Sequence, residues 1–390
     1  MAERLGFAHF NETSINSSAI SELNGWYATG GHQAELLSNF SANLSPQTVW
    51  VSNLPYQTVH QMGQPVIPHL RSKAFFRIDP HTIAEEYGLR SIEKNRLTTE
   101  LTRVLSKITS QIDIACHQIA PNIVWGRTLK ESLAKAFNIQ PDEVQTSHRD
   151  CVTQILANTQ TFSSPLTEKN INDTLCYLTP NRVFFLEKLC QFDLPKGEGR
   201  LVERISLDEV FYKLTTPAFL DVVINFDGCN NPNLPAFGIN KNTPRHWVST
   251  AEAYFLNEYG ANIEVKRALV FSDSLRIPMI KELKRNPFVT NSYAYGIIAE
   301  NYLAAFLNNN SRMRGSYLRS LERMLSFQFA QHLDRHGFSV KSYGYGKVFV
   351  YYDKDRHDEL INLSALMDFS MVTIDSRFFE NSVRVDEVML

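Results

Sequence analysis

Two kinds of pattern alternate along the C-terminal half of the chain, and this alternation limits the folds that are open to it. Strands are predicted by two runs rich in β-branched residues, "AFLDVVINFDG" and "NIEVKRALVF". Between them, "STAEAYFLNEYG" predicts a helix that begins at Ser249 or Thr250 and ends at Gly260. A long helix ending at Gly337, two strands around a glycine-containing turn, a helix and a last strand follow. The pattern predicts an α+β fold, with an open mixed β-sheet covered by helices.

The N-terminal half is predicted to be mainly helical. Leucine and isoleucine at three- and four-residue spacing predict one long helix, which begins near Ser91 and is stopped by Pro121. Before it come short extended-looking runs closed by proline, "QTVWVSNLP" and "SKAFFRIDP". The glycine- and proline-containing stretch "QFDLPKGEGRLVER" is the expected boundary between the halves. We therefore expect an extended, β-containing region at 1–85, a helical domain at 86–195 and a mixed α/β domain at 205–390.

Composition excludes several classes of protein. Apolar residues make up 43% of the 390, charged residues 21%, and the formal net charge is −2, which is an ordinary globular composition and not that of a polycation. The five cysteines are scattered and odd in number, so neither a disulfide framework nor a zinc ribbon is predicted. No leader pattern and no membrane-length apolar stretch occurs. A cytoplasmic protein without membrane contact is expected.

Asp353-Lys354-Asp355, at the end of a strand pattern, has two interpretations. Alternate residues of a strand point the same way, so Asp353 and Asp355 could share a Mg²⁺ ion, with Asp227 as a further acid from another strand. Clustered acids of this kind hold the ions of phosphoryl-transfer sites. The alternative is a polar turn between a strand and a helix, with Asp358 near the helix N-terminus. The turn is the favoured interpretation.

Two short motifs resemble those of family B DNA polymerases. "YYDKD" at 351–355 resembles their Tyr-X-Asp-Thr-Asp motif, and "NSYAYG" at 291–296 resembles their Asn-Ser-X-Tyr-Gly helix motif. Asp227, Asn291 and Asp353 also follow the order of the palm motifs. Lysine replaces the threonine of the first motif, the second has one residue too many, and no Ser-Leu-Tyr-Pro follows Asp227. No activity is carried over from these matches.

A nuclease-like set is also present. Metal-dependent nucleases often place Glu-X-Lys on a strand beside an aspartate from a neighbouring strand, so that one ion and one lysine stabilise the developing charge. Glu264 and Lys266 lie in a strand pattern, with Asp227 upstream. With Asp353 and Asp355, these residues are the candidates for a Mg²⁺-dependent enzyme acting on phosphodiesters. Asp227 and Asp353 are the candidate metal ligands.

Residues 128–156 partly fit a helix-turn-helix pattern. Ala134 falls where two helices would pack closely, and Asn138 falls where the turn needs glycine or asparagine. A second helix, expected at about 142–158, would offer His148 and Arg149 to a DNA groove. Two ordinary core helices joined by a turn would produce the same pattern.

Residues 312–347 are locally basic, with five more positive than negative side chains in a chain of net charge −2. Arginine and lysine interleaved with tyrosine suit phosphate contact and base stacking. The alternative is the solvated face of an amphipathic helix. The candidate nucleic-acid-binding residues are Arg312, Arg314, Arg319, Arg323, Lys341, Tyr343, Tyr345 and Lys347.

Three functions follow from these patterns. The first is a protein that contacts nucleic acid, or a subunit of a nucleoprotein assembly, through the basic, tyrosine-containing C-terminal segment. The second is the Mg²⁺-dependent nuclease or polymerase-like enzyme. The third is a structural subunit without catalysis, which would act through protein partners or as a homo-oligomer.

Overall fold

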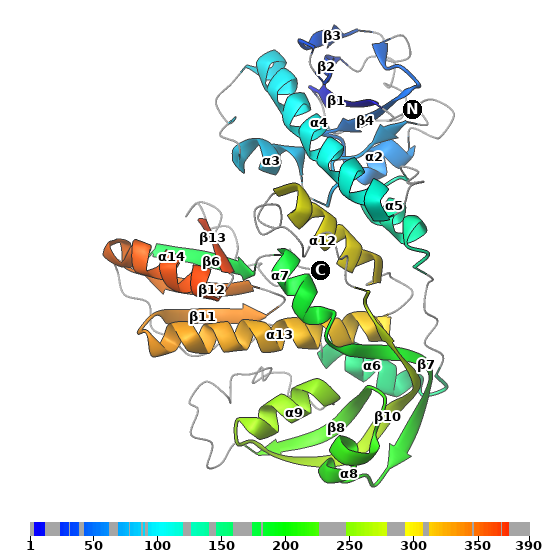
Figure 1. Ribbon diagram of the computed structural model, residues 1–390, viewed down its shortest axis with the longest axis vertical. Coiled ribbons are helices and arrows are strands. Elements are labelled where there is room, and N and C mark those ends of the chain that lie inside the picture. Colours follow the sequence, from blue (N-terminus) through cyan, green and yellow to red (C-terminus); the bar gives the residue numbers. More distant parts are fainter. Residues whose placement is uncertain are drawn as a thin grey trace. The chain divides into compact units, whose positions relative to one another are not determined.

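A computed structural model describes most of the chain (Figure 1). The described residues are 4–11, 24–30, 32–38, 43–61, 69–77, 79–86, 89, 93–119, 126–139, 146–158, 174–180, 182–225, 247–278, 293–306, 312–344, 347–367 and 369–373. Helices and strands both contribute extensively, which confirms the α+β class. The chain divides into two compact units: unit 1 comprises residues 1–140 and 280–305, and unit 2 comprises residues 141–279 and 306–390.

Unit 1 is built on a five-stranded sheet of order β3-β2-β1-β4-β5. The central strand β1 pairs antiparallel with β2 and parallel with β4, and β4 pairs parallel with β5. The strands are β1 (Arg4–Phe10), β2 (Gly25–Thr29), β3 (Glu35–Leu37), β4 (Thr48–Ser52) and β5 (Leu70–Arg71). The run "QTVWVSNLP" is therefore confirmed as extended, since β4 occupies most of it.

The two faces of this sheet are covered differently. Ala8, Phe10 and Trp50 belong to a core cluster on one face, where a side chain on Gly6 would meet the Trp50 ring. The long helix α4 packs against β1 and β2, and its contact with His9 places it on the other face. The helices of unit 1 are α2 (Tyr56–Gln61), α3 (Pro80–Glu86), α4 (Lys94–Ile119), α5 (Leu129–Ala136) and α12 (Tyr293–Phe306).

Unit 2 contains two four-stranded sheets, in which every pair of neighbouring strands is antiparallel. The first has the order β7-β10-β8-β9 and the second the order β11-β12-β6-β13. The strands of the first are β7 (Asp193–Glu203), β8 (Ala218–Asn225), β9 (Trp247–Ser249) and β10 (Asn262–Arg276). Those of the second are β6 (Thr174–Pro180), β11 (Ser339–Gly344), β12 (Lys347–Tyr352) and β13 (Phe369–Thr373).

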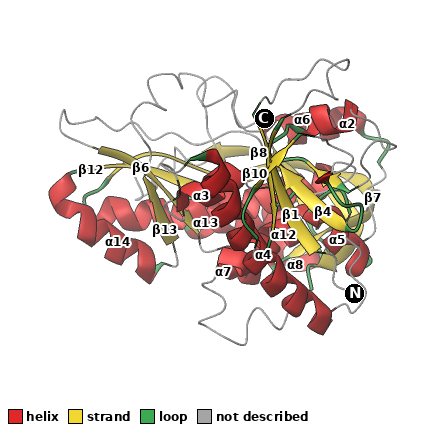
Figure 2. Ribbon diagram, turned by 90° about the horizontal axis from the view of Figure 1, so that it is seen from above, coloured by secondary structure: helices red, strands yellow, loops and turns green. Residues whose placement is uncertain are grey.

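One helix joins the two sheets of unit 2. α13 (Arg312–Arg335) packs against β11 and β12 of one sheet and against β7 and β9 of the other. A single hydrophobic cluster accordingly runs from Leu220 through Phe327 to Val350. Figure 2 shows α14 (His357–Leu366) along one side of the second sheet. The other helices of unit 2 are α6 (Arg149–Asn158), α7 (Arg182–Leu189), α8 (Leu207–Lys213) and α9 (Thr250–Glu258).

Two stretches differ from their sequence-based expectation. In "SKAFFRIDP", backbone hydrogen bonds from Phe75 to Ser72 and from Arg77 to Ala74 close successive turns, so the expected extended run is wrong. These turns bury Phe75, and the Lys73–Asp79 ion pair spans them. The stretch "QFDLPKGEGRLVER", expected to be a boundary, contains strand β7. Its proline is tolerated because β7 is an edge strand.

The turn expected at Asn138 is present, and the described part of the following helix starts later than the sequence indicates. Asn138 has a left-handed backbone with φ of 50°, as the sequence indicates. α6 begins only at Arg149, so His148 precedes it. α5 belongs to unit 1 and α6 to unit 2. Among the described residues, no helix combines the length and apolar content that crossing a bilayer requires.

Candidate nucleic-acid interface

α13 carries four of the arginines expected to contact nucleic acid, and two of these are buried. Arg314 is 2% exposed and Arg323 is 1% exposed. The Arg323 guanidinium donates from Nε and from a terminal nitrogen to Oε1 of Glu252, at 2.9 and 2.7 Å. Glu252 lies in α9 and is fully buried. Removing one partner of such a pair would leave the other charge buried and unpaired. Arg323 therefore joins α13 to α9 and is not a surface cation.

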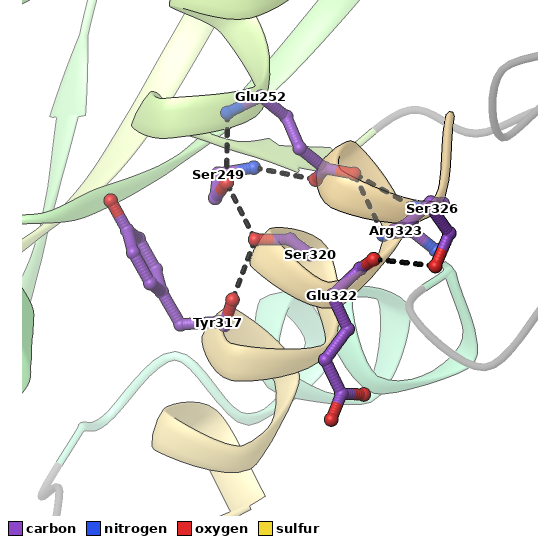
Figure 3. Close-up of polar contacts among 7 residues, drawn as sticks. All are labelled: Ser249, Glu252, Tyr317, Ser320, Glu322, Arg323 and Ser326. Atoms are coloured by element: carbon purple, nitrogen blue, oxygen red, sulfur yellow. Dashed lines mark hydrogen bonds and ion pairs between the residues drawn. The ribbon is translucent and has the colours of Figure 1, made fainter. Parts of the chain in front are cut away.

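Hydroxyl groups surround this ion pair (Figure 3). Ser249 caps α9 by accepting from the Glu252 backbone, and the Glu252 carboxylate accepts in turn from the Ser249 backbone. The hydroxyl of Ser320 in α13 lies 2.8 Å from that of Ser249. The Tyr317 hydroxyl lies 2.8 Å from that of Thr250, and burial raises the pKa of Tyr317 to about 12. The first half of α13 thus presents polar groups to the interior of unit 2.

The other residues expected to contact nucleic acid differ in how exposed they are. Tyr343 is buried, with its ring centroid 5.6 Å from that of Phe327. Arg319 is partly exposed. The side chains of Arg312 and Lys347, and all of Tyr345, lie outside the described residues. Lys341 belongs to the expected set, lies on a strand and is partly exposed, and the structure describes its surroundings.

Lys341 lies on β11 beside a tyrosine of β12. Val348, Val350 and Tyr352 of β12 join the hydrophobic cluster, so the alternation of a strand places Tyr351 on the opposite face. Tyr351 is partly exposed, and the Lys341 ammonium lies 5.9 Å from the centroid of its ring. That separation is at the outer limit of a cation–π contact. We call Lys341 and Tyr351 the Lys–Tyr pair.

A bulge in β11 accounts for the position of Lys341. Val340 pairs with Val350, whereas the next pair along is Ser342 with Phe349, so Lys341 is an extra residue in the ladder. Sequence reasoning selected Tyr343 and Tyr345 and missed Tyr351. The period-two pattern of "KVFVYY" contains the signal, because it separates Tyr351 from the valines of the core.

Asp353-Lys354-Asp355 forms the turn between β12 and α14. The Asp353 carboxylate accepts from the backbone N–H of Asp355 at 3.3 Å, and it caps a short 3₁₀ helix, η3 (Lys354–Arg356). α14 follows directly, with Asp358 in its first turn. Asp353 and Asp355 are both exposed. The favoured sequence interpretation, a polar turn leading into a helix, is confirmed.

The proposed metal-binding and catalytic residues are not brought together by the described part of the chain. Glu264 and Lys266 are exposed on β10. The pairing of β10 with β8 shifts register between Val265 and Arg267. Asp227 follows β8 and lies outside the described residues. β8 and β12 belong to different sheets. Among the described residues, no three histidine, cysteine, aspartate or glutamate side chains are grouped so as to hold a metal ion.

A pocket of about 360 Å³ lies elsewhere in unit 2, between α8, α9 and α13. Its lining mixes apolar and polar side chains, and its hydroxyls include those of Thr250 and Tyr317. The charged residue in the lining is Asp193, which accepts from Nε and a terminal nitrogen of Arg276 at 3.0 and 3.3 Å. Among the described residues that line the pocket, none carries a positive charge.

Comparisons with known proteins give structural matches only. No family model matches the chain, and no curated protein matches its sequence. The chain is similar to Phi29 DNA polymerase complexed with primer-template DNA and incoming nucleotides, with a TM-score of 0.45 and 9% identity, over 90% of this chain and 80% of that chain. It is also similar to Phi29 DNA polymerase complexed with single-stranded DNA, with a TM-score of 0.43 and 11% identity, over 72% of this chain and 60% of that chain.

Proposed function

We propose that the protein contacts single-stranded nucleic acid through the Lys–Tyr pair on the sheet β11-β12-β6-β13. The observation that supports this proposal is the position of the Lys341 ammonium above the Tyr351 ring, with both side chains partly exposed. An unpaired base can stack on the tyrosine ring while the ammonium contacts a neighbouring phosphate. Unpaired bases are needed because a duplex hides their faces within its own stack.

The proposed interface contains fewer residues than the set expected from the positive charges of residues 312–347. Arg323 is held by Glu252, and Arg314 is buried, so the proposal assigns neither a role in binding. The sheet supplies the stacking surface, and α13 supports it from the hydrophobic cluster. Stacking of a base on an aromatic side chain is worth roughly 1–3 kcal/mol. A single pair of this kind therefore favours weak, sequence-tolerant binding.

Fluorescence anisotropy with labelled single-stranded DNA, single-stranded RNA and duplex DNA tests the proposal. Tyr351→Leu keeps an apolar side chain but removes the extended ring system, and should weaken single-strand binding by about 5- to 150-fold. Lys341→Ala should weaken binding and reduce the slope of log K against log salt by about 0.7. The matched controls are Tyr212→Leu, at a tyrosine that is 87% exposed on α8, and Lys107→Ala, at an exposed lysine of α4.

The controls decide the interpretation. Binding that falls equally in Tyr351→Leu and Tyr212→Leu would overturn the proposed interface, as would a wild-type chain that binds none of the three probes at low salt. The same probes incubated with Mg²⁺ or Mn²⁺ test the enzymatic alternative. Cleavage or extension that is lost in Asp227→Asn would assign that activity instead.

A further inference from the structure

The C-terminal end of α13 carries two histidines four residues apart. His332 lies in the last turn of the helix, and His336 directly follows it. The backbone N–H of His336 still donates to the carbonyl of Leu333 at 3.0 Å, so the helical turn continues to His336 and the two side chains share one face. Their imidazole rings are in contact, with centroids 4.5 Å apart and planes inclined at 51°. Neither ring takes part in the Lys–Tyr pair.

One hydrogen bond determines the form of the His336 ring. Its Nδ1 lies 2.8 Å from the backbone carbonyl oxygen of His332. A carbonyl oxygen only accepts, so Nδ1 carries a proton and donates it. The neutral ring then has its lone pair on Nε2. Histidines that bind metal ions are held in the same way, because one ring nitrogen donates to a carbonyl or a carboxylate while the other binds the ion.

The His332 ring has a nitrogen without a partner. Its Nε2 is buried and makes no hydrogen bond to the described part of the chain. Buried polar atoms in native proteins are nearly always paired, so an unpaired one calls for a ligand or another functional reason. His332 as a whole is partly exposed, and His336, whose ring packs on it, is exposed. A small movement of the His336 ring therefore opens this nitrogen to an ion from solvent.

The separation of the two rings allows both to bind one ion. A metal ion lies about 2.0–2.1 Å from an imidazole nitrogen, which places it about 3.2 Å from the ring centroid. Two rings on one ion then have centroids about 4.5 Å apart at a right angle and about 5.2 Å apart at a tetrahedral angle. The 4.5 Å between the rings of His332 and His336 corresponds to the right angle, which square-planar and tetragonal Ni²⁺ and Cu²⁺ sites use. Tetrahedral Zn²⁺ would require the rings to separate slightly.

Charges of both signs surround the two rings. Arg356, in η3, donates from its terminal nitrogens to the carbonyls of Gly337 and His336, at 3.0 and 2.7 Å. The same guanidinium is paired with both carboxylate oxygens of Glu359 in α14, at 2.8 and 2.9 Å. Glu359 also lies close enough to His336 for the two to interact electrostatically, so a carboxylate is present to offset the charge of an ion. Arg335 is exposed, and solvent screens its charge.

We propose that His332 and His336 bind one divalent transition-metal ion of the class Ni²⁺, Cu²⁺ and Zn²⁺, through one ring nitrogen each. We call these two residues the α13 histidine pair. Imidazole is a ligand that these ions favour, whereas Mg²⁺ favours oxygen. Among the described residues no third histidine, cysteine or carboxylate completes a cluster, so water fills the remaining positions on the ion. The α13 histidine pair shares no residue with the Lys–Tyr pair and does not depend on the proposed function.

A bound ion would join the last turn of α13 to the turn that leads into β11. That strand begins at Ser339, soon after His336. The folded helix end holds the two imidazoles together, whereas the unfolded chain does not, so the ion should bind the folded chain more tightly. Ligands with this preference raise the stability of the folded state. Metal binding therefore has two readouts, the affinity itself and the resistance of the chain to unfolding.

The test is calorimetric titration of the full chain with Ni²⁺, Zn²⁺ and Mg²⁺ at about pH 7.5, where an ordinary imidazole is neutral. We expect Ni²⁺ and Zn²⁺ to bind, and His332→Gln and His336→Gln each to weaken that binding by about tenfold or more. Loss of a residue that only supports a metal ligand already costs about 10- to 100-fold. The matched control is His60→Gln, which should have no effect. His60 is exposed in the last turn of α2, but Tyr56 lies four residues before it.

Two further measurements complete the test. Urea unfolding with and without Ni²⁺ should show a higher midpoint with the ion in wild type and in His60→Gln, and no change in His332→Gln or His336→Gln. The curves without metal also show that each variant is folded. Electron paramagnetic resonance of Cu²⁺ bound to the wild-type chain counts nitrogen ligands without any substitution, and should find two.

The outcomes are distinct. A loss of affinity in only one of the two α13 variants, or a single nitrogen on Cu²⁺, would show that one histidine acts alone and would overturn the pair. No binding of any ion, an equal loss in His60→Gln, or Mg²⁺ binding as tight as that of Ni²⁺ would overturn it as well. Binding of single strands by the Lys–Tyr pair is measured without added metal, so failure of one proposal is separable from failure of the other.

Discussion

His9 is a buried histidine that unit 1 keeps neutral, and this has a consequence for stability against acid. Its pKa falls from 6.5 in the unfolded chain to about 4 in the folded one. The unfolded chain therefore binds more protons between these two values, and the free energy of unfolding decreases as the pH falls from about 6.5 to about 4. The full loss would be roughly 3 kcal/mol.

Chemical unfolding at a series of pH values measures this effect. His9→Gln should be less stable than wild type at neutral pH, and the difference should shrink as the solution is acidified. Parallel curves for wild type and His9→Gln would show that the His9 imidazole does not titrate in this range.

The buried ion pair of Arg323 with Glu252 could not be predicted from the sequence. The count of positive residues in 312–347 treats Arg323 as available, because its partner Glu252 is 71 positions away in the chain. Nothing local to either residue indicates that the two meet in the interior. By contrast, the conformation of Asn138 could be predicted, since a left-handed residue in a tight turn favours asparagine or glycine for purely local reasons.

At the scale of elements, two serine caps offer a controlled comparison. Ser206 begins α8 and Ser249 begins α9, and each forms a capping box with a glutamate three residues later. Ser206 is exposed, whereas Ser249 is buried against Ser320. Ser206→Ala should lower the free energy of unfolding by about 1 kcal/mol, the usual value for an N-cap. Ser249→Ala should cost about 2–3 kcal/mol, since it also leaves the Glu252 N–H buried without its acceptor.

Urea unfolding of both variants under identical conditions measures the difference. Equal losses for the two serines would show that burial adds nothing to the cap of α9. A larger loss for Ser206→Ala would contradict the network of Figure 3, because water can replace the cap of an exposed helix but not that of a buried one.

Helices and hairpins that are marked by local capping or turn residues could be predicted from the sequence. Strands that depend on pairing with distant strands could not. α9 is capped by the expected Ser249, and the residue after its C-cap is the expected Gly260, which has a positive φ of 91°. The hairpin of β11 and β12 was also expected, from a glycine turn between apolar runs. β7 was not, since its proline and glycines favour a loop and its strand character comes from pairing with β10. The division of the strands between two sheets likewise depends on pairings that no local pattern records.

At the scale of the molecule, unit 1 is assembled from two separate stretches of chain. α12 returns to it after more than a hundred residues of unit 2. The buried amide of Asn301 in α12 donates to the carbonyl of Phe76 at 2.9 Å, and Tyr302 packs edge-to-face on Phe137 at 4.9 Å. Sequence patterns mark α12 as a helix but give no indication of the unit to which it belongs.

This arrangement predicts that residues 1–140 do not fold alone. Without α12, the Phe76 carbonyl loses its buried partner and Phe137 loses an aromatic neighbour. A chain that joins residue 140 to residue 280 through a flexible linker and ends at 305 should unfold cooperatively, as followed by circular dichroism. The same chain carrying Asn301→Leu is the control and should be less stable. Cooperative unfolding of 1–140 by itself would contradict the prediction.

The return of α12 also affects how the protein is made. A ribosome adds roughly 5–20 residues per second, so α12 emerges on the order of ten seconds after residue 140. During that interval the first stretch of unit 1 has left the ribosome without the helix that completes it, while the strands of unit 2 are still being synthesised. The nascent chain therefore presents incomplete apolar surface for seconds. This makes its early synthesis the stage at which a chaperone would be needed most.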